Sequence, residues 1–580
     1  MFRKRRKLKI VLIVLAVIAV AALTTLLIIT QHYKGIVKKE LPKWVADGTD
    51  GLYKLSLKSI GVNIFTNQIT FKKVNITPDT SVINQLPAND PKRRVLVSLY
   101  IPKLYINGTD IEAYLNSKRL NCSSLQIEQP TIIIDHKSAC NDDASSKKKA
   151  HLRSVKFNRI ILNDANITYK NTSKEKSTLV NASNVSTTLY DWEFIPSAPY
   201  DSSKIFYADR ATVETGAVKL LTDSLLYQVA FEKADYDTKQ ERITIHGFTI
   251  LPKYDNEEFY THVGHQCDIY NLNLQSIEFA QFSWQKLIYD NAFISDNVYI
   301  NNSSLHIFHS RIPPEDPHDK LGKFPHQILQ KSPLPIGIKQ LKIKNGTVGY
   351  SELNKKTNKV GDIEFSSLEG EINNITNIPK QLDSNNSCEM NIKAKFNTYS
   401  DLNAVFNLDL TDEKGGFSVK GKLTDLEAHQ VTEQSKALTR LEINSLRLQY
   451  LDIDIEGNEQ YAKGKFTMAY KGLKIKIPRA VPKKGSENDG MLSFIANNVF
   501  IYTHNPMPGK EIRHVSTYVK RDKYKSFFNL IWKNIFQAAT KTAIRDPNIL
   551  EMLNKPKKEK EEKKQKGRFK NLFKKKNREQ

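Results

Sequence analysis

Side chains that could do chemistry gather in a few short stretches of this sequence. His262, His265 and Cys267 lie within six residues of one another, and imidazole and thiolate groups are common zinc ligands. A zinc site needs three or four ligands that converge on one point, and the sequence offers no evident partner cluster. We therefore interpret these residues as ordinary loop or strand positions and predict no metal site.

A second stretch has the spacing of a phosphate-binding loop. It runs from Gly416 to Gly421 and Lys422, but Leu423 stands where such a loop places Ser or Thr against magnesium. The residues between the two glycines alternate in the manner of a strand. We therefore interpret the match as chance.

Acidic residues that could act as a general acid or base are also explained by strand geometry. Asp452 and Asp454 alternate with apolar residues, which places both on the solvent-exposed face of a predicted strand. The sequence also lacks a Gly-x-Ser-x-Gly nucleophile motif. These observations predict a protein that is not an enzyme and uses no cofactor.

The elements that must position these residues are predicted to be strands, because apolar residues recur with period two along most of the chain. The clearest alternations are Leu402, Ala404, Phe406, Leu408 and Leu410, then Leu446, Leu448 and Tyr450, then Phe466, Met468 and Tyr470. The expected fold class is mainly β, with an elongated, curled antiparallel sheet. A single sheet of roughly 20 to 28 strands would be on the order of 100 to 130 Å long, and stacked two-layer sandwiches are the alternative.

One strand-turn-strand unit recurs in the sequence. An apolar alternation meets an Asn-centred turn and then resumes at residues 104–111, 160–167, 298–305 and 341–348. Asn-Gly pairs, as at Asn107-Gly108, are typical of tight hairpin turns. Recurrence of one supersecondary unit favours an extended sheet over a pocketed enzyme.

A single membrane segment is predicted at the N-terminus. Residues 10–30 carry no charge, and about twenty apolar residues cross a hydrocarbon layer of roughly 30 Å. Six basic residues in the stub formed by residues 1–9 should stay in the cytoplasm. The body from residue 31 onward is then exported. A cleaved signal peptide is the alternative, but the apolar run exceeds its usual core of roughly 7 to 15 residues.

The net charge of +25 is concentrated at the two ends of the chain. Residues 555–580 contain 13 Lys and Arg against 4 acidic residues, so the body itself is only mildly basic. An exported chain whose basic residues lie in its tail is not expected to bind nucleic acid. The tail suits anionic lipid head groups, or it is simply a disordered, solvated segment.

Helix is expected mainly near the ends, at residues 33–46 and 523–543, with one short helix near residues 324–329. The segment 523–543 is strongly amphipathic. Its candidate membrane-interface residues are Phe527, Phe528, Ile531, Trp532 and Phe536. The alternative, which we favour, is a helix that plugs the end of the sheet with its apolar face.

Four cysteines are too few for a disulfide scaffold. Cys122 and Cys140 bracket one predicted hairpin arm, so a disulfide between them is the expected pairing in an exported chain. Free buried thiols are the alternative. Cys267 and Cys388 lie far from this pair in the sequence.

Two stretches of the exported body resemble AsmA-like envelope proteins. The first is residues 53–79, from Tyr53-Lys-Leu-Ser-Leu to Ile-Thr-Pro-Asp79, where strands that follow a membrane helix end in a Pro-Asp turn. The second comprises Tyr350-Ser-Glu352, Gly361-Asp-Ile-Glu-Phe365, Asn374-Ile-Thr-Asn377, Phe417-Ser-Val-Lys-Gly-Lys-Leu423 and Gly464-Lys-Phe-Thr-Met-Ala-Tyr470. The shared pattern contains no invariant catalytic residue.

This resemblance implies a repeating β-groove whose concave apolar face shields acyl chains. A sheet with one apolar face and few helices has little to cover that face except another sheet or lipid. The candidate lipid-groove residues are Phe406, Leu408, Phe466, Met468 and Tyr470.

The expected organisation is a cytoplasmic stub (1–9), a transmembrane helix (10–30), two parts of a β-groove (31–330 and 331–520), an amphipathic segment (521–553) and a basic tail (554–580). The expected function is that of an inner-membrane-anchored periplasmic protein that handles or bridges phospholipid between envelope membranes. Its expected partners are phospholipid, the inner membrane, and the outer membrane or an outer-membrane protein. A structural or assembly scaffold that carries no lipid is the alternative.

Overall fold

A computed structural model describes residues 33–545, apart from residues 64, 88–89, 91–92, 94, 111–116, 118, 137–152, 172–177, 196–197, 199–200, 223–225, 440–441 and 477–500. The transmembrane helix expected at residues 10–30 and the basic tail at residues 554–580 lie outside the described residues. Among the helices that are described, none is long and apolar enough to cross a membrane.

Strands dominate the described chain, as the period-two pattern predicts. The strands are β1 (Tyr53–Ser56), β2 (Ser59–Asn63), β3 (Gln68–Pro78), β4 (Val95–Thr109), β5 (Arg119–Glu128), β6 (Thr131–His136), β7 (Ser154–Asn171), β8 (Thr178–Phe194), β9 (Arg210–Thr215), β10 (Val218–Thr222), β11 (Tyr227–Phe231), β12 (Lys233–Asp237), β13 (Arg242–Pro252), β14 (Asp268–Phe282), β15 (Phe293–Ser310), β16 (Ile336–Asn354), β17 (Lys359–Thr376), β18 (Ser387–Phe396), β19 (Ser400–Asp409), β20 (Phe417–Glu427), β21 (Glu442–Gly457), β22 (Tyr461–Lys476) and β23 (His514–Lys520). The helices are α2 (Tyr33–Gly48), α3 (Thr80–Gln85), α5 (Asn256–Val263), α6 (Trp284–Tyr289), α7 (Pro325–Gln330), α8 (Pro379–Leu382), the 3-10 helix η2 (Ala428–Gln430), α9 (Thr432–Thr439) and α11 (Phe527–Ala543).

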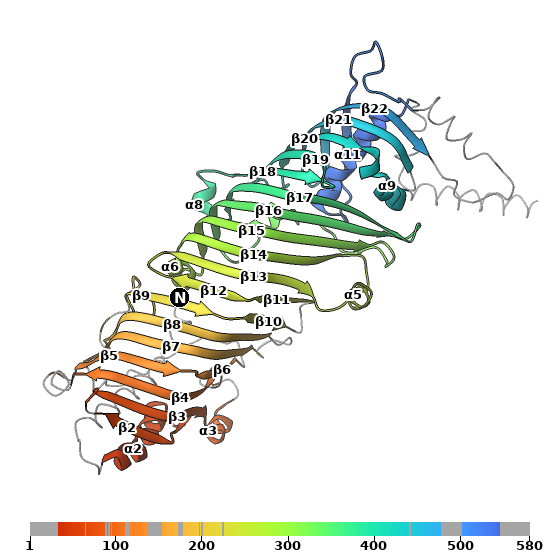
Figure 1. Ribbon diagram of the computed structural model, residues 1–580. Helices are drawn as coiled ribbons and strands as arrows, with labels where there is room; N and C mark the ends of the chain where they lie inside the picture. The colour runs from red at the N-terminus through yellow and green to blue at the C-terminus, as the bar shows by residue number, and fades with distance from the viewer. Residues whose placement is uncertain are drawn as a thin grey trace, which may run out of the picture.

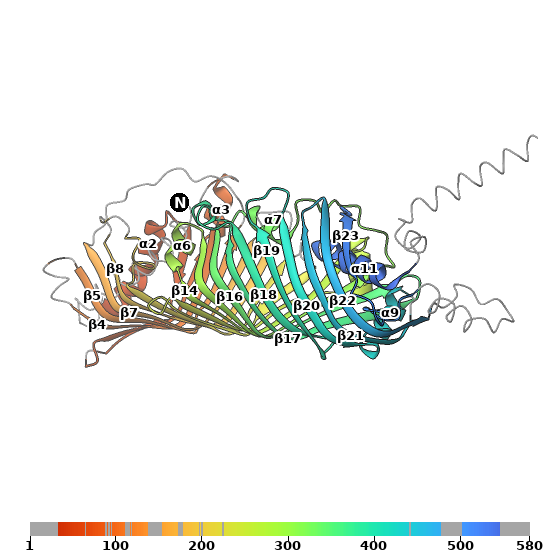
Figure 2. The ribbon, with the colours of Figure 1, turned by 90° about the horizontal axis from the view of Figure 1, so that it is seen from above.

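All 23 strands of the described residues belong to one elongated, curled sheet (Figures 1 and 2). The expected mainly-β fold is therefore confirmed, and the sandwich alternative does not apply. Neighbouring strands are mostly antiparallel and follow chain order, but β15 pairs parallel to β16, and β5 and β6 pair parallel to β7. The domain boundary expected at residue 330 falls in the crossover between β15 and β16, so the sheet continues across it.

The sheet is shorter than its strand count suggests. The pairs β1 and β2, β5 and β6, β9 and β10, and β11 and β12 each lie end to end beside the same neighbouring strand. The 23 strands therefore occupy 19 positions across the sheet, which corresponds to about 90 Å at about 4.8 Å per position. The expected 100 to 130 Å is too long because it treats each strand as a separate position.

Three of the recurring Asn-centred units lie inside continuous strands rather than at hairpin turns, and those of β7 and β16 coincide with register shifts that mark β-bulges. Residues 160–167, 298–305 and 341–348 each lie inside a single strand, in β7, β15 and β16. Asp164, Asn302 and Asn345 have φ values of 50°, 50° and 52°, a left-handed conformation that Asn and Asp adopt more readily than most residues. An extra residue at a bulge bends the strand and increases its twist. The prediction of turns was wrong because a local sequence does not distinguish a turn from a bulge.

The bulges keep one face of the sheet apolar. An inserted residue shifts the alternation by one, so that positions of one parity before the bulge share a face with positions of the other parity after it. In β16 the apolar residues change from the odd positions Leu341 and Ile343 to the even positions Val348 and Tyr350, and the register with β17 shifts between Ile343 and Val348. The apolar pattern therefore continues along strands that are 15 to 19 residues long in β14, β15 and β16.

Packed cores fill the two ends of this apolar face. At the N-terminal end, Leu41 and Val45 of α2 pack with Ile69 and Phe71 of β3. At the C-terminal end, α11 packs on β21, β22 and β23 and lies inside the curl (Figure 2). The apolar face is therefore the concave one, and its ends are closed by side chains of the chain itself.

Candidate functional site

The middle of the concave face carries apolar residues that are not packed into either end core. Leu305 pairs with Val348, and Val348 pairs with Phe365 across three neighbouring strands. A strip of such residues, called here the open strip, consists of Ile250, Leu305, Ile307, Val348, Ile363 and Phe365. All six are half-buried and lie outside the packed clusters of the described chain. Fully buried core residues would be expected to contact neighbours on every side, so the open strip has apolar surface that the described chain leaves uncovered.

The open strip is continuous with the core at the C-terminal end. Phe365 pairs with Phe396 of β18, with ring centroids 5.5 Å apart. On the same face, Met390 pairs with Phe406, which pairs in turn with Val419 of the C-terminal core. Because Leu272 of β14 pairs with both Ile250 and Leu305, an apolar path runs across the strands from β13 to β18 and on to the strands beneath α11.

The predicted groove residues divide into two groups. Leu408, Phe466 and Tyr470 are 5%, 2% and 0% exposed, and the Tyr470 hydroxyl donates to the Tyr502 carbonyl at 2.9 Å. These three are core residues beneath α11. Phe406 and Met468 are half-buried on the same face. The residues of the open strip were missed, although their alternation in the sequence was available as a signal.

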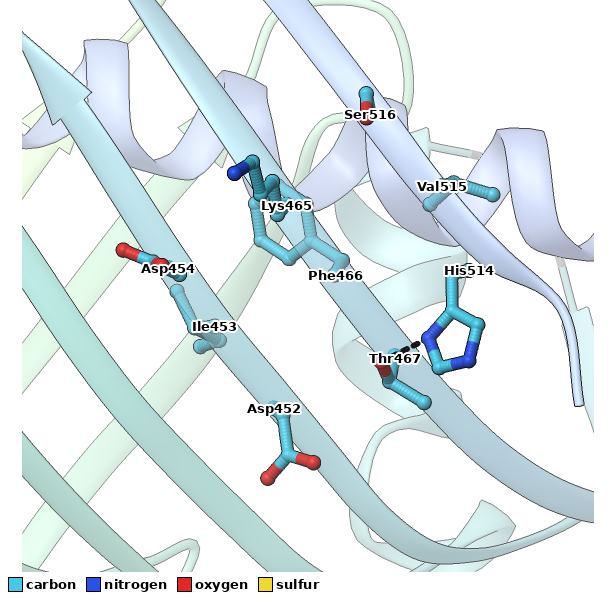
Figure 3. A pocket seen from close by; sticks show the side chains of 9 residues that line it. All are labelled: Asp452, Ile453, Asp454, Lys465, Phe466, Thr467, His514, Val515 and Ser516. Carbon is cyan, nitrogen blue, oxygen red and sulfur yellow. Dashed lines mark hydrogen bonds between the residues drawn. The ribbon is translucent and has the colours of Figure 1, made fainter.

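The convex face of the sheet is polar. Asp452 and Asp454 lie on it together with Lys465, His514 and Ser516, and these side chains line a shallow hollow (Figure 3). Its contacts are ordinary cross-strand pairs: Thr467 Oγ1 lies 2.7 Å from His514 Nδ1, and Asp452 lies 3.8 Å from Lys422. The two aspartates are thus accounted for as surface residues of β21.

The residues of the phosphate-loop match lie in β20, whose Phe417 and Val419 are buried and whose Lys420 is exposed. The glycine-rich stretch therefore forms a strand, as its alternation predicted. A phosphate-binding loop needs successive backbone N–H groups that point at the ligand. In β20 they are paired with β19 and β21 instead.

His306, Ser351 and Asp362 form a further polar cluster on the convex face. His306 Nε2 lies 2.8 Å from Ser351 Oγ, and this hydroxyl donates to Asp362 Oδ1. In a nucleophilic triad the histidine bridges the serine and the carboxylate. Here the serine is in the middle and its proton points at the carboxylate, so the histidine is not placed to activate it.

Helix α11 has two apolar faces with different environments. Ser526 caps its N-terminus by accepting from the Asn529 N–H. Phe527 is 6% exposed, and its ring centroid lies 4.9 Å from Phe324 and 4.8 Å from Phe417. Ile531 is also buried. This face plugs the end of the sheet, which is the alternative favoured by the sequence.

The second face of α11 is an exposed aromatic row. Phe528, Trp532 and Phe536 are 62%, 52% and 40% exposed, and their spacing of four residues places them on one side of the helix. Of the five membrane-interface candidates, these three are therefore accessible, whereas Phe527 and Ile531 are not. Contact of this row with a membrane stays a prediction.

The cysteine pairing also stays a prediction. Cys140 lies outside the described residues. Cys122 is buried, and its Sγ lies 3.6 Å from Thr109 Oγ1. Burial raises the pKa of the Cys122 thiol to about 12, so it is protonated at neutral pH and a poor nucleophile. Cys267 and Cys388 are free thiols.

The histidine motif of the α5–β14 region is split by the fold. His262 lies on α5 and stacks on Tyr254, with ring centroids 4.2 Å apart. His265 instead lies near Asp316 and His318 of the β15–β16 crossover, and one ligand-type atom from each of the three residues falls within 4.8 Å of the others. The sequence expectation that no partner cluster exists therefore missed this group, because its members are some fifty residues apart in the chain.

Comparison with known proteins adds no relative to this picture. No family model matches the chain, and no curated protein matches it.

Proposed function

We propose that this protein handles phospholipid in a cell envelope by shielding acyl chains along the concave apolar face of its sheet. The observation that supports this most directly is the open strip, where six apolar residues of β13, β15, β16 and β17 are only half-buried. Exposed apolar patches that are rimmed by polar residues mark sites of interaction with apolar ligands, proteins or membranes. The elongated shape of the strip suits a chain-like ligand.

The energetics favour a ligand that is recognised by its apolar area. Each CH2 group removed from water contributes about 0.8 kcal/mol, so an acyl chain of about sixteen carbons contributes on the order of 10 kcal/mol. Leu305, Val348 and Phe365 supply only such generic contacts. We therefore expect the face to accept acyl lipids with little discrimination between chain types.

The membrane setting is part of the proposal. Residues 1–30 are proposed to anchor the chain in the inner membrane with the N-terminus in the cytoplasm, which places the sheet in the periplasm. The resemblance to AsmA-like envelope proteins supports the same setting. The protein would then bridge or buffer phospholipid between the two envelope membranes and so support the outer membrane.

Site-specific photocrosslinking tests this proposal with a matched pair of positions. Leu305 and Ser304 are adjacent in β15, but their side chains lie on opposite faces of the sheet. A photoactivatable amino acid at Leu305 should give phospholipid adducts in living cells, whereas the same group at Ser304 should not. Protein-only adducts at Leu305 would count against lipid contact.

A scaffold that carries no lipid is the second candidate, and the closed ends of the concave face favour it. Residues such as Phe71 of β3 and Tyr470 of β22 are fully buried, so a lipid could not slide along the whole face without rearrangement of both cores. Under this alternative, the Leu305 photocrosslinker should capture one defined protein partner. The same experiment therefore separates the two candidates.

A further inference from the structure

The structure brings together a histidine, an aspartate and a second histidine from two distant segments. His265 follows Gly264, the left-handed residue that ends α5, and precedes β14. Asp316 and His318 belong to the crossover between β15 and β16, residues 311–335. His318 Nδ1 lies 2.9 Å from Asp316 Oδ1, and His265 Nδ1 lies 3.7 Å from the same oxygen.

We propose that His265, Asp316 and His318 form a zinc site that fastens the crossover to the start of β14. Zinc binds histidine nitrogen and aspartate oxygen at about 2.0 to 2.2 Å in a tetrahedral arrangement. Two ligand atoms of such a site lie about 3.3 Å apart, whereas the observed separations are 2.9 and 3.7 Å and all three atoms lie within 4.8 Å of one another. On binding, His265 Nδ1 would exchange its 3.1 Å contact with the Gln266 carbonyl for the metal. Water would occupy the fourth position.

The backbone that carries these ligands is already held in place. Gln266 is 8% exposed, and its Nε2 donates to the carbonyls of Arg311 and Pro313 at 3.2 and 3.0 Å. Its backbone N–H donates to the Pro314 carbonyl at 2.8 Å. The residue next to His265 therefore fixes the crossover segment just ahead of Asp316, so little chain entropy is lost when the ligands converge on a metal.

The Tyr260 hydroxyl makes a second connection between the start of β14 and the segment that leads into the crossover. The Tyr260 hydroxyl donates to the Cys267 carbonyl at 2.8 Å and accepts from the Ser310 N–H at 2.7 Å. Tyr260 is 8% exposed, so α5, the start of β14 and the end of β15 form one rigid corner. Ligands on a rigid corner keep a defined geometry, which is what metal sites require.

The charges around the cluster are compatible with a divalent cation. Asp316 contributes one negative charge. Its Oδ2 lies 3.1 Å from Lys320, and its Oδ1 accepts from the His318 backbone N–H at 3.0 Å, so the metal would take the second lone pair of Oδ1. The Asp316 side chain is 11% exposed, whereas that of His318 is 69% exposed. The site is therefore open to solvent on the His318 side, so a zinc ion could reach it without unfolding of the corner.

Such a site would stabilise the crossover between β15 and β16 rather than the concave apolar face. The crossover carries Phe324, which is 0% exposed and packs on Phe417 and Phe527 in the C-terminal core. A zinc ion bound by His265 would hold the first residues of the crossover, and the packing of Phe324 would hold its middle. Binding to the folded state alone raises its stability by mass action.

The experiment uses the full chain, purified in detergent and freed of metal by chelation, and titrated with zinc chloride. We expect one zinc per chain by elemental analysis and an upward shift of the melting temperature. The variants His265→Ala and His318→Ala should each weaken zinc binding at least tenfold, since even loss of an outer partner of a metal ligand costs about 10- to 100-fold. Cobalt in place of zinc should give the visible absorption of a tetrahedral site.

The control is His262→Ala, which removes a histidine of the same motif that stacks on Tyr254 instead. This variant should bind zinc like the parent chain. The melting temperatures of all variants without zinc separate a folding defect from a loss of ligand. Failure of the parent chain to bind zinc stoichiometrically, or equal binding by the double variant His265→Ala/His318→Ala, would overturn the assignment.

Discussion

The adjacent residues Phe527 and Phe528 allow a sharp test of how α11 closes the sheet. Phe527 is 6% exposed and lies between Phe324 and Phe417, whereas Phe528 is 62% exposed. Replacement of a buried Phe by Ala typically costs about 3 to 5 kcal/mol. Replacement of an exposed one should cost under about 1 kcal/mol. The two substitutions remove the same atoms from neighbouring positions, so their difference reports packing alone.

Hydrogen exchange of the α11 amides measures the difference in the local stability of α11 between the two variants. A loss of about 3 kcal/mol corresponds to a more than 100-fold increase in the opening equilibrium, at 1.4 kcal/mol per tenfold. Amides of α11 should therefore exchange about 100-fold faster in Phe527→Ala, and within a few-fold of the parent rate in Phe528→Ala. Exchange is read element by element because local stability varies along a structure.

Amides far from α11 serve as an internal control in the same experiment. In a sheet where each strand contacts mainly its neighbours, a local defect should remain local. Amides of β7 and β8, at the other end of the sheet, should keep their parent rates in both variants. Equal acceleration of α11 in Phe527→Ala and Phe528→Ala, or no acceleration in either, would refute the plug geometry.

Three further outcomes are expected. Asn302→Val places a β-branched residue at φ 50° and should lower the stability of the β14–β16 region by about 1 to 3 kcal/mol. Asn302→Gly should not lower it, and urea unfolding followed by hydrogen exchange measures both variants. Burial lowers the pKa of His326 below its ordinary 6.5, so the unfolded chain takes up a proton that the folded chain resists, and the free energy of unfolding falls as the pH drops below about 6.5. Thermal melts between about pH 7.5 and 5.5 should show this dependence in the parent chain. His326→Leu should flatten it, and the control His429→Leu, at an exposed site, should leave it unchanged. Leu305→Asp should reduce co-purifying phospholipid several-fold by charging the open strip, because apolar burial supplies the affinity, and Ser304→Asp should leave the amount unchanged when lipids are extracted and quantified by mass spectrometry.

Much of the fold could be predicted because a strand's side-chain pattern is a local property. Phe466, Met468 and Tyr470 alternate in the sequence, and they share one face of β22 in the structure. The amphipathic pattern of residues 523–543 likewise predicted α11. The expected helix near residues 324–329 is α7. In each case, neighbours in the sequence determine the geometry.

The turns were wrong for a reason that is also physical. Asn345 and Gly346 suit a tight turn, but the same left-handed residue suits a bulge, and only pairing with β15 and β17 on either side keeps the strand going. Pairing of this kind depends on segments that lie dozens of residues away. The sequence pattern at one position could not distinguish the two outcomes.

The sequence by itself determined which side chains are apolar on each strand, and hence that the sheet has one apolar and one polar face. Only the tertiary structure decided where the apolar face is covered. Leu408 and Leu305 both occur in strand alternations, yet Leu408 is buried in the core that α11 and α7 complete, and Leu305 is only half-buried. The structure likewise brought His265 to Asp316 and His318 through the β15–β16 crossover. Coverage and convergence depend on which distant segments meet, whereas alternation depends only on neighbours along the chain.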